Sequence, residues 1–175
     1  MIIQNKQMRP LILLLTFFLC TSNLKAQPKD WAIGLRGGAP IGLSVKRYIA
    51  KDHAWSFTVG RYDHAYWDNN YWKDYRPRAL VLNAHYLWQQ DIPKAKGLML
   101  FYGPGGQIVI RQYGDRKNGE APSNFALGLS GVLGVEYFIP NTPLSVFGEI
   151  GPYVELFPAF LWIGFDYGGG IRVNF

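Results

Sequence analysis

Apolar and polar residues alternate with a period of two along nearly all of the chain beyond residue 26. That period places successive side chains on opposite faces, as in a β-strand with a different environment on each side. Turn-forming residues separate the alternating segments, and no window has the 3.6-residue period of an amphipathic helix. The sequence therefore predicts eight strands, at residues 31–38, 41–49, 54–62, 79–90, 97–113, 125–139, 144–157 and 164–175.

The lengths of the connections indicate how these strands are joined. The segments after the second, fourth and sixth strands are short (AKDH, DIPKAK and PNTP), whereas those after the third and fifth are long. Short turns at one rim and long loops at the other are typical of outer-membrane barrels. We predict an all-β fold, an eight-stranded antiparallel up-and-down transmembrane β-barrel. The tight connection GGAP fits least well, because it falls at the long-loop rim.

The two faces of the predicted strands differ in character. One face is apolar and nearly uncharged, with Arg47 and Arg61 near strand ends and with aromatic residues gathered toward those ends, as at membrane interfaces. The other face combines glycines and small polar residues with four positive and four negative side chains: Arg36, Lys46, Arg111, Arg172, Glu136, Glu149, Glu155 and Asp166. Balanced charges suit a narrow interior, where an unpaired charge is costly. We predict an apolar outside and a plugged, charge-paired lumen, since eight strands leave just enough width for side chains.

The first 26 residues have the features of a secretory signal peptide. Lys6 and Arg9 precede an apolar run at residues 11–20, and Leu24 and Ala26 have the spacing of a cleavage site. We expect removal of residues 1–26, with residues 27–175 forming the barrel domain. Cys20 would leave with the signal, and the formal charge would fall from +6 to +3 because Lys6, Arg9 and Lys25 are lost. Export and this small charge argue against a nucleic-acid partner.

The C-terminal segment GGGIRVNF carries a family resemblance. Gly170, Val173 and Phe175 match the form polar-x-Gly-x-x-apolar-x-apolar, although Gly168 stands where a polar residue is expected. With its length, strand number and signal peptide, the chain resembles the small eight-stranded outer-membrane barrels, the size class of the OmpA membrane domain and OmpX. This resemblance implies residence among the lipids of a Gram-negative outer membrane. It also implies insertion by the barrel-assembly machinery after passage with periplasmic chaperones.

Two membrane-enzyme families share this size and were compared with the sequence. The palmitoyltransferase barrel has an N-terminal helix and a loop His, Asp and Ser, but here QPKD leaves no room for that helix and no Ser accompanies His64. The lipid A deacylase barrel has His-x-Ser on a strand, whereas His85 is followed two residues later by Leu87. A nucleophile needs a base beside it. We therefore expect no enzyme, and we interpret His85 as part of a polar network in the lumen.

Metal and cofactor sites are not expected either. His53, His64 and His85 fall in a short turn, a long loop and a lumen strand, so they cannot converge on one ion. The segment GPGGQ at residues 103–107 lacks the lysine and the helix that follow in a phosphate-binding loop.

The loop at residues 63–78 is the one segment with binding character. It mixes rings with positive charges, in particular Tyr66, Trp67, Tyr71, Trp72, Lys73, Arg76 and Arg78. The rings either extend the aromatic girdle beyond the membrane or contact a glycan, lipopolysaccharide or protein at the surface. The three basic residues would suit lipid phosphates.

Together these patterns predict a non-catalytic integral outer-membrane protein with a structural or surface-interaction role. Three alternatives remain open: a small solute or ion channel, an outer-membrane lipid-modifying enzyme, and a soluble periplasmic barrel that holds a ligand in an apolar cavity. A fold of this kind does not by itself determine function.

Overall fold

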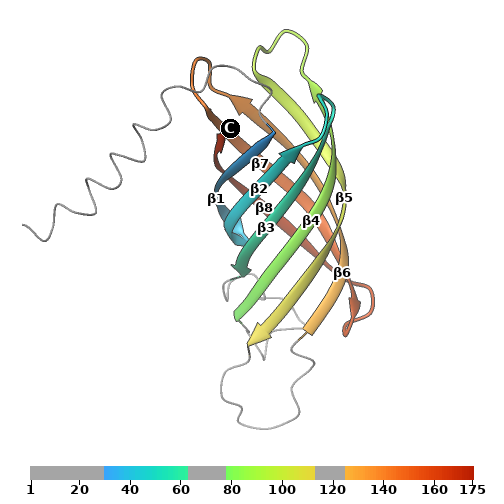
Figure 1. Ribbon diagram of the computed structural model, residues 1–175. Coiled ribbons are helices and arrows are strands. Elements are labelled where there is room, and N and C mark those ends of the chain that lie inside the picture. The colour runs from blue at the N-terminus through green and yellow to red at the C-terminus, as the bar shows by residue number, and fades with distance from the viewer. Residues whose placement is uncertain (1–29, 63–77, 113–124) are drawn as a thin grey trace, which may run out of the picture.

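The computed structural model describes residues 30–62, 78–112 and 125–175, which form a closed barrel (Figure 1). Each strand pairs antiparallel with its neighbour in sequence, and β8 pairs with β1. The strands are β1 (Trp31–Ala39), β2 (Ile41–Tyr48), β3 (His53–Tyr62), β4 (Arg78–Asp91), β5 (Leu98–Gln112), β6 (Phe125–Phe138), β7 (Leu144–Phe157) and β8 (Trp162–Asn174). Within these ranges, no helix has the length and apolar character needed to cross a membrane. The predicted eight-stranded antiparallel up-and-down barrel is confirmed, with strand ends within two residues of those expected from the sequence.

The barrel closes through the C-terminal segment. Ile33 lies opposite Val173, and Arg36 lies opposite Gly170. Phe175 follows β8, and its backbone exchanges hydrogen bonds with that of Trp31 at 2.9 and 3.1 Å, while its side chain is exposed. The alternating apolar and polar residues of the C-terminal segment therefore form part of the β1–β8 ladder that closes the barrel. The role of Gly170, Val173 and Phe175 as an assembly signal stays a prediction.

Along each strand, successive side chains alternate between the outside and the inside of the barrel. Along β3, Trp55, Phe57 and Val59 are exposed, whereas the residues between them point inward and are buried. Large apolar side chains are exposed on every strand, and charges on this outward face are placed near strand ends, as with Arg47 and Arg61. The polar face is therefore inside and the apolar face outside.

The two rims of the barrel are unlike. One, the short-turn rim, carries both ends of the barrel domain and the turns after β2, β4 and β6 (Figure 1). Near it, rings contact one another across three strands, with centroids 5.2 Å apart for Trp55 and Tyr86, 5.5 Å for Tyr86 and Trp88, and 5.9 Å for Trp88 and Tyr102. The other, the long-loop rim, has the tight connection between β1 and β2, the turn between β7 and β8, and the described ends of β3 and β5.

The wall of the barrel has unequal height. Strands β1 and β2 contain 9 and 8 residues, whereas β4 to β8 contain 13 to 15. The tight connection GGAP accounts for the difference, because it ends β1 and starts β2 well before β4 and β5 reach the same rim (Figure 1). The GGAP connection, which agreed least with the expected long loops at this rim, thus makes the barrel shorter at β1 and β2. We call this part of the barrel the low section of the wall.

The interior differs from the sequence-based expectation in one respect. The inward face was expected to hold glycines, small polar residues and charges, but it also holds large apolar side chains. Leu87, Phe101, Phe147, Tyr62 and Tyr153 are all at most 3% exposed. A lumen with only small and charged groups would leave voids, which packed interiors avoid, so these rings fill the space that glycines on neighbouring strands leave.

Barrel closure can be tested with paired cysteines. Ile33→Cys with Val173→Cys places two thiols directly opposite one another on the same face, within reach of a disulfide. Oxidation should cross-link this pair and remove its free thiols, as measured by maleimide labelling. Ile33→Cys with Ile171→Cys is the matched control, since both thiols stay on the outward face but their diagonal spacing of about 7–8 Å exceeds the reach of a disulfide. Equal cross-linking in both variants would contradict the register.

Candidate functional site

Five charged lumen residues form one continuous chain of ion pairs. Lys46 Nζ lies 2.6 Å from Glu136 Oε2, and Arg172 Nη1 lies 3.3 Å from Glu136 Oε1. Arg172 Nη2 lies 3.9 Å from Glu149 Oε2, while Arg36 Nε donates to Glu149 Oε1 at 2.8 Å. The order Lys46–Glu136–Arg172–Glu149–Arg36 joins β1, β2, β6, β7 and β8. The network therefore ties together strands on both sides of the β1–β8 seam.

Hydroxyl groups and rings complete the environment of this network. Ser145 donates to Glu136 Oε1 at 2.7 Å, and Ser44 accepts from Arg172 Nε at 3.1 Å and Nη2 at 2.9 Å. The Arg172 guanidinium lies 3.5 Å from the centroid of the Phe147 ring, a cation–π contact. These contacts replace part of the hydration that the ions lose on burial.

The remaining lumen charges lie nearer the long-loop rim. Arg111 Nη2 donates to Glu155 Oε2, and Glu155 Oε1 accepts the backbone N–H of Ala159 at 3.1 Å. Asp166 accepts hydrogen bonds from the Tyr62 hydroxyl and from Asn83 Nδ2, the second at 3.4 Å. All eight charged residues predicted for the lumen thus point inward, with seven in ion pairs and Asp166 hydrogen-bonded.

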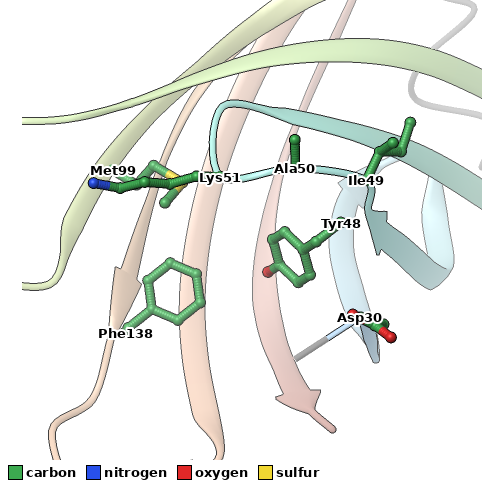
Figure 2. A pocket seen from close by; sticks show the side chains of 7 residues that line it. All are labelled: Asp30, Tyr48, Ile49, Ala50, Lys51, Met99 and Phe138. Carbon is green, nitrogen blue, oxygen red and sulfur yellow. The ribbon is translucent and has the colours of Figure 1, made fainter. Parts of the chain in front are cut away.

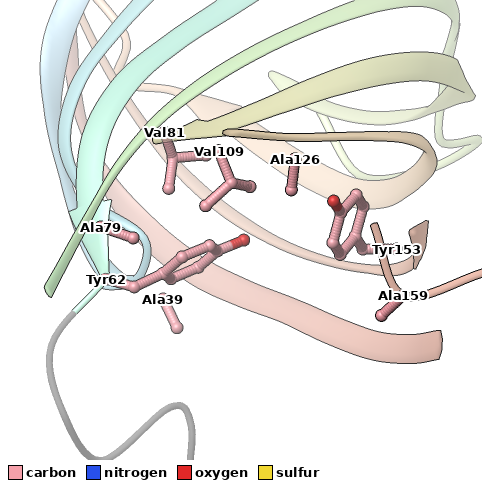
Figure 3. Packing of buried hydrophobic residues seen from close by; sticks show 8 residues of the cluster. All are labelled: Ala39, Tyr62, Ala79, Val81, Val109, Ala126, Tyr153 and Ala159. Carbon is pink, nitrogen blue, oxygen red and sulfur yellow. The ribbon is translucent and has the colours of Figure 1, made fainter. Parts of the chain in front are cut away.

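Two apolar clusters occupy the lumen together with the charges. The first lies toward the long-loop rim and contains Ala39, Tyr62, Ala79, Val81, Val109, Ala126, Tyr153 and Ala159 (Figure 3). The second lies toward the short-turn rim and contains Ala54, Leu87, Phe101 and Phe147. Lys46 Nζ lies 4.9 Å from the Phe101 ring centroid, so charges and rings share the same cross-section. Ion pairs and aromatic rings therefore lie side by side in the described part of the lumen.

One pairing in the lumen was missed at the sequence level. His85 Nε2 lies 2.9 Å from Ser130 Oγ, although the two residues are separated by β5. Gly105 lies between them, and a Cβ there would come within 2.5 Å of the His85 ring. The spacing rule of the deacylase family could not find this pair, because the serine is on β6 rather than two residues after the histidine. The only available signal was the glycine in GPGGQ.

The space beside this pair is small. It is lined by His85, Asn83, Arg36, Glu149 and Asp166 and offers about 10 Å³. A single buried water needs about this much room. A Ser–His pair is the start of a nucleophilic site, but an ester substrate must also reach the serine. Here both residues are at least nine-tenths buried, so the geometry favours a structural hydrogen bond.

A wider hollow lies at the short-turn rim (Figure 2). Its volume is about 460 Å³, and its lining is mostly apolar, with Tyr48, Phe138, Met99 and Ile49. The rings of Tyr48 and Phe138 lie 6.4 Å apart, and the Tyr48 hydroxyl donates to Asn174 Oδ1 at 3.0 Å. These contacts form the floor of the hollow and separate it from the ion pairs below.

Several predicted residues cannot be placed. Tyr66, Trp67, Tyr71, Trp72, Lys73 and Arg76 lie outside the described residues, as do His64 and residues 1–26. Arg78 begins β4. Among the described ranges, no three His, Cys, Asp or Glu side chains are grouped so that they could hold a metal ion.

Removing one member of the buried network should destabilise the barrel strongly. Glu136→Gln leaves Lys46 and Arg172 without their shared carboxylate, so the free energy of unfolding should fall by about 3 kcal/mol. Lys51→Gln is the control, since its pair with Asp91 is exposed and should contribute less than about 0.5 kcal/mol. Urea unfolding in lipid vesicles, followed by tryptophan fluorescence, measures both. Similar decreases in the free energy of unfolding for the two variants would show that the buried network stabilises the barrel no more than an exposed ion pair does.

No protein-family model and no curated protein sequence matches the chain. A solved structure does match: the crystal structure of Neisserial surface protein A (NspA), with a TM-score of 0.55 and 14% sequence identity. The match covers 83% of this chain and 93% of the NspA chain. At this identity the likeness concerns the fold, and this chain has the same fold as NspA.

Proposed function

We propose that the protein is an integral outer-membrane β-barrel with a plugged, charge-paired lumen and a non-catalytic structural or surface-interaction role. The observation that carries this proposal is the distribution of its side chains. Apolar residues are exposed on all eight strands, among them Leu35 (70%), Leu129 (59%), Phe165 (61%) and Ile171 (55%), while the paired ions lie inside. Soluble monomers rarely expose an apolar surface that continues around the whole molecule.

The closed topology supports the same environment. In hydrocarbon every backbone N–H and C=O must be paired within the protein, which a sheet achieves only by closing. The β1–β8 ladder supplies that closure. Aromatic rings near the short-turn rim, including Trp55, Trp88 and Tyr102, occupy the position of an interfacial girdle. The likeness to NspA, a surface protein by its name, agrees with this location.

Of the alternative functions, a soluble barrel with an apolar interior is least compatible with these features, because the ions are inside and the apolar residues outside. A channel would need a continuous polar path, whereas the described lumen is crossed by Phe101, Phe147, Tyr62 and Tyr153. The proposed partners are outer-membrane lipids, the barrel-assembly machinery and periplasmic chaperones. The loop at residues 63–78 is the proposed contact for a surface ligand or protein.

The location is tested by the behaviour of the folded protein in detergent and bilayers. The protein should migrate differently on a gel before and after boiling, because a closed barrel resists detergent until its strands melt. It should also insert into liposomes and give no discrete conductance steps in a planar bilayer. Solubility without detergent and an unchanged mobility would contradict a membrane barrel, and reproducible conductance steps would favour the channel.

The non-catalytic role is tested at the Ser130–His85 pair. A fluorophosphonate probe, which reacts with activated serines, should not label the wild-type protein, since Ser130 is buried and the cavity beside its partner His85 has room for about one water. Ser130→Ala should give the same blank result. Labelling of the wild type that disappears in both Ser130→Ala and His85→Ala would instead identify a catalytic pair.

A further inference from the structure

Arg61 is a cation on the outward face near the long-loop rim, beside the tight connection between β1 and β2. Arg61 is the second-last residue of β3, exposed, and lies opposite Ile41 on β2 and Leu80 on β4. Within the described residues Arg61 forms no ion pair. Its counterpart near the other rim, Arg47, is different, because its guanidinium lies 5.3 Å from the Trp31 ring centroid.

The depth of Arg61 follows from the strand geometry. A strand rises about 3.3 Å per residue, and at a tilt of about 40° the six residues from Trp55 to Arg61 span about 15 Å along the barrel axis. The apolar band of such barrels is about 25 Å tall. On β8 the exposed apolar positions run from Ile171 through Phe165 to Ile163, so the tall side of the wall continues to face hydrocarbon. Because Trp55 belongs to the ring cluster near the short-turn rim, Arg61 lies at a depth that is still within this apolar band.

A shallow apolar recess adjoins Arg61. It has a volume of about 680 Å³ and runs over the outward surface of β1 to β4, between Leu35, Ile41, Leu43, Val59 and Leu80. In a bilayer such a recess is filled by hydrocarbon chains. The Arg61 guanidinium, at the end of the recess toward the long-loop rim, needs an anion at the same depth. An outer-leaflet lipid that carries phosphate supplies both groups in one molecule.

We propose that this recess is a binding site for a phosphate-bearing lipid of the outer leaflet, with a phosphate paired to Arg61 and an acyl chain between Leu35 and Val59. The guanidinium can donate two parallel hydrogen bonds to a phosphate, which a point charge cannot. Holding the headgroup at this depth thins the outer leaflet beside β1 and β2, and the small number of residues in these two strands matches the thinner layer. This inference rests on the proposed outer-membrane location.

The test uses the detergent-solubilised protein and diphosphoryl hexa-acyl lipid A, with binding measured by native mass spectrometry. Arg61→Gln should raise the Kd about tenfold, as expected for the loss of a charge-assisted contact. Removing the phosphates from the lipid should weaken binding by the same factor in the wild type and change nothing further in Arg61→Gln. Val59→Trp, which fills the recess without changing charge, should also weaken binding.

Arg47→Gln is the matched control, because it removes an outward arginine near the opposite rim and should leave the Kd within about twofold. Equal binding by wild type and Arg61→Gln, or an equal loss in Arg47→Gln, would overturn the site. The mobility shift on boiling and the insertion into liposomes are recorded on the same samples. A protein that inserts normally but binds lipid A independently of Arg61 refutes this inference alone, whereas a protein that does not insert refutes the proposed function.

Discussion

The structure depends on one constraint, the closure of a backbone hydrogen-bond ladder into a ring. Eight strands paired only with their sequence neighbours would leave the outer edges of β1 and β8 unpaired. The ladder from Ala32–Asn174 to Ala39–Tyr167 removes both edges. Closure also creates an inside and an outside, so the alternation along each strand becomes a separation of two environments. The ion pairs inside the barrel and the apolar surface outside it both follow from this separation.

The inside of so narrow a ring must be filled, and this barrel fills it with ions and rings in the same layers. Phe147 stacks against the Arg172 guanidinium, and Phe101 lies beside the Lys46 ammonium. Glycines make these arrangements possible. A Cβ on Gly168 would come within 2.6 Å of the Arg36 guanidinium carbon. The Gly37 carbonyl oxygen lies equally close to such a Cβ, at 2.6 Å, which favours glycine at position 168, where the terminal pattern described for the sequence has a polar residue.

The unequal height of the wall is the second consequence of local sequence. A tight connection after β1 limits β1 and β2 to 9 and 8 residues, so this side of the barrel presents a shorter apolar band than the side formed by β4 to β7. In contrast, the long strands β7 and β8 are joined by a turn that exposes the apolar side chains of Phe160 and Leu161. The barrel thus meets its surroundings asymmetrically, and a lipid bilayer adapts to such differences more readily than a packed protein does.

The sequence by itself determined the number of strands, their approximate ends, their antiparallel order and the face of each strand that carries the charged residues. It could do so because side-chain direction in a strand has a period of two, and because turn residues interrupt that period at each connection. The eight lumen charges were found for the same reason, since Arg36, Glu149 and the others each lie at an inward position of their own strand.

Only the tertiary structure decided which inward residues meet. Contacts across the lumen join residues more than a hundred positions apart, such as Arg36 and Glu149, and they depend on the stagger of the strands around the ring. The stagger of the strands also decides three other features: the Ser130–His85 pair, the apolar clusters around Tyr62 and Phe101, and the recess beside Arg61. A periodic pattern specifies the face on which a side chain lies, but the height at which it meets its neighbours is set when the barrel closes.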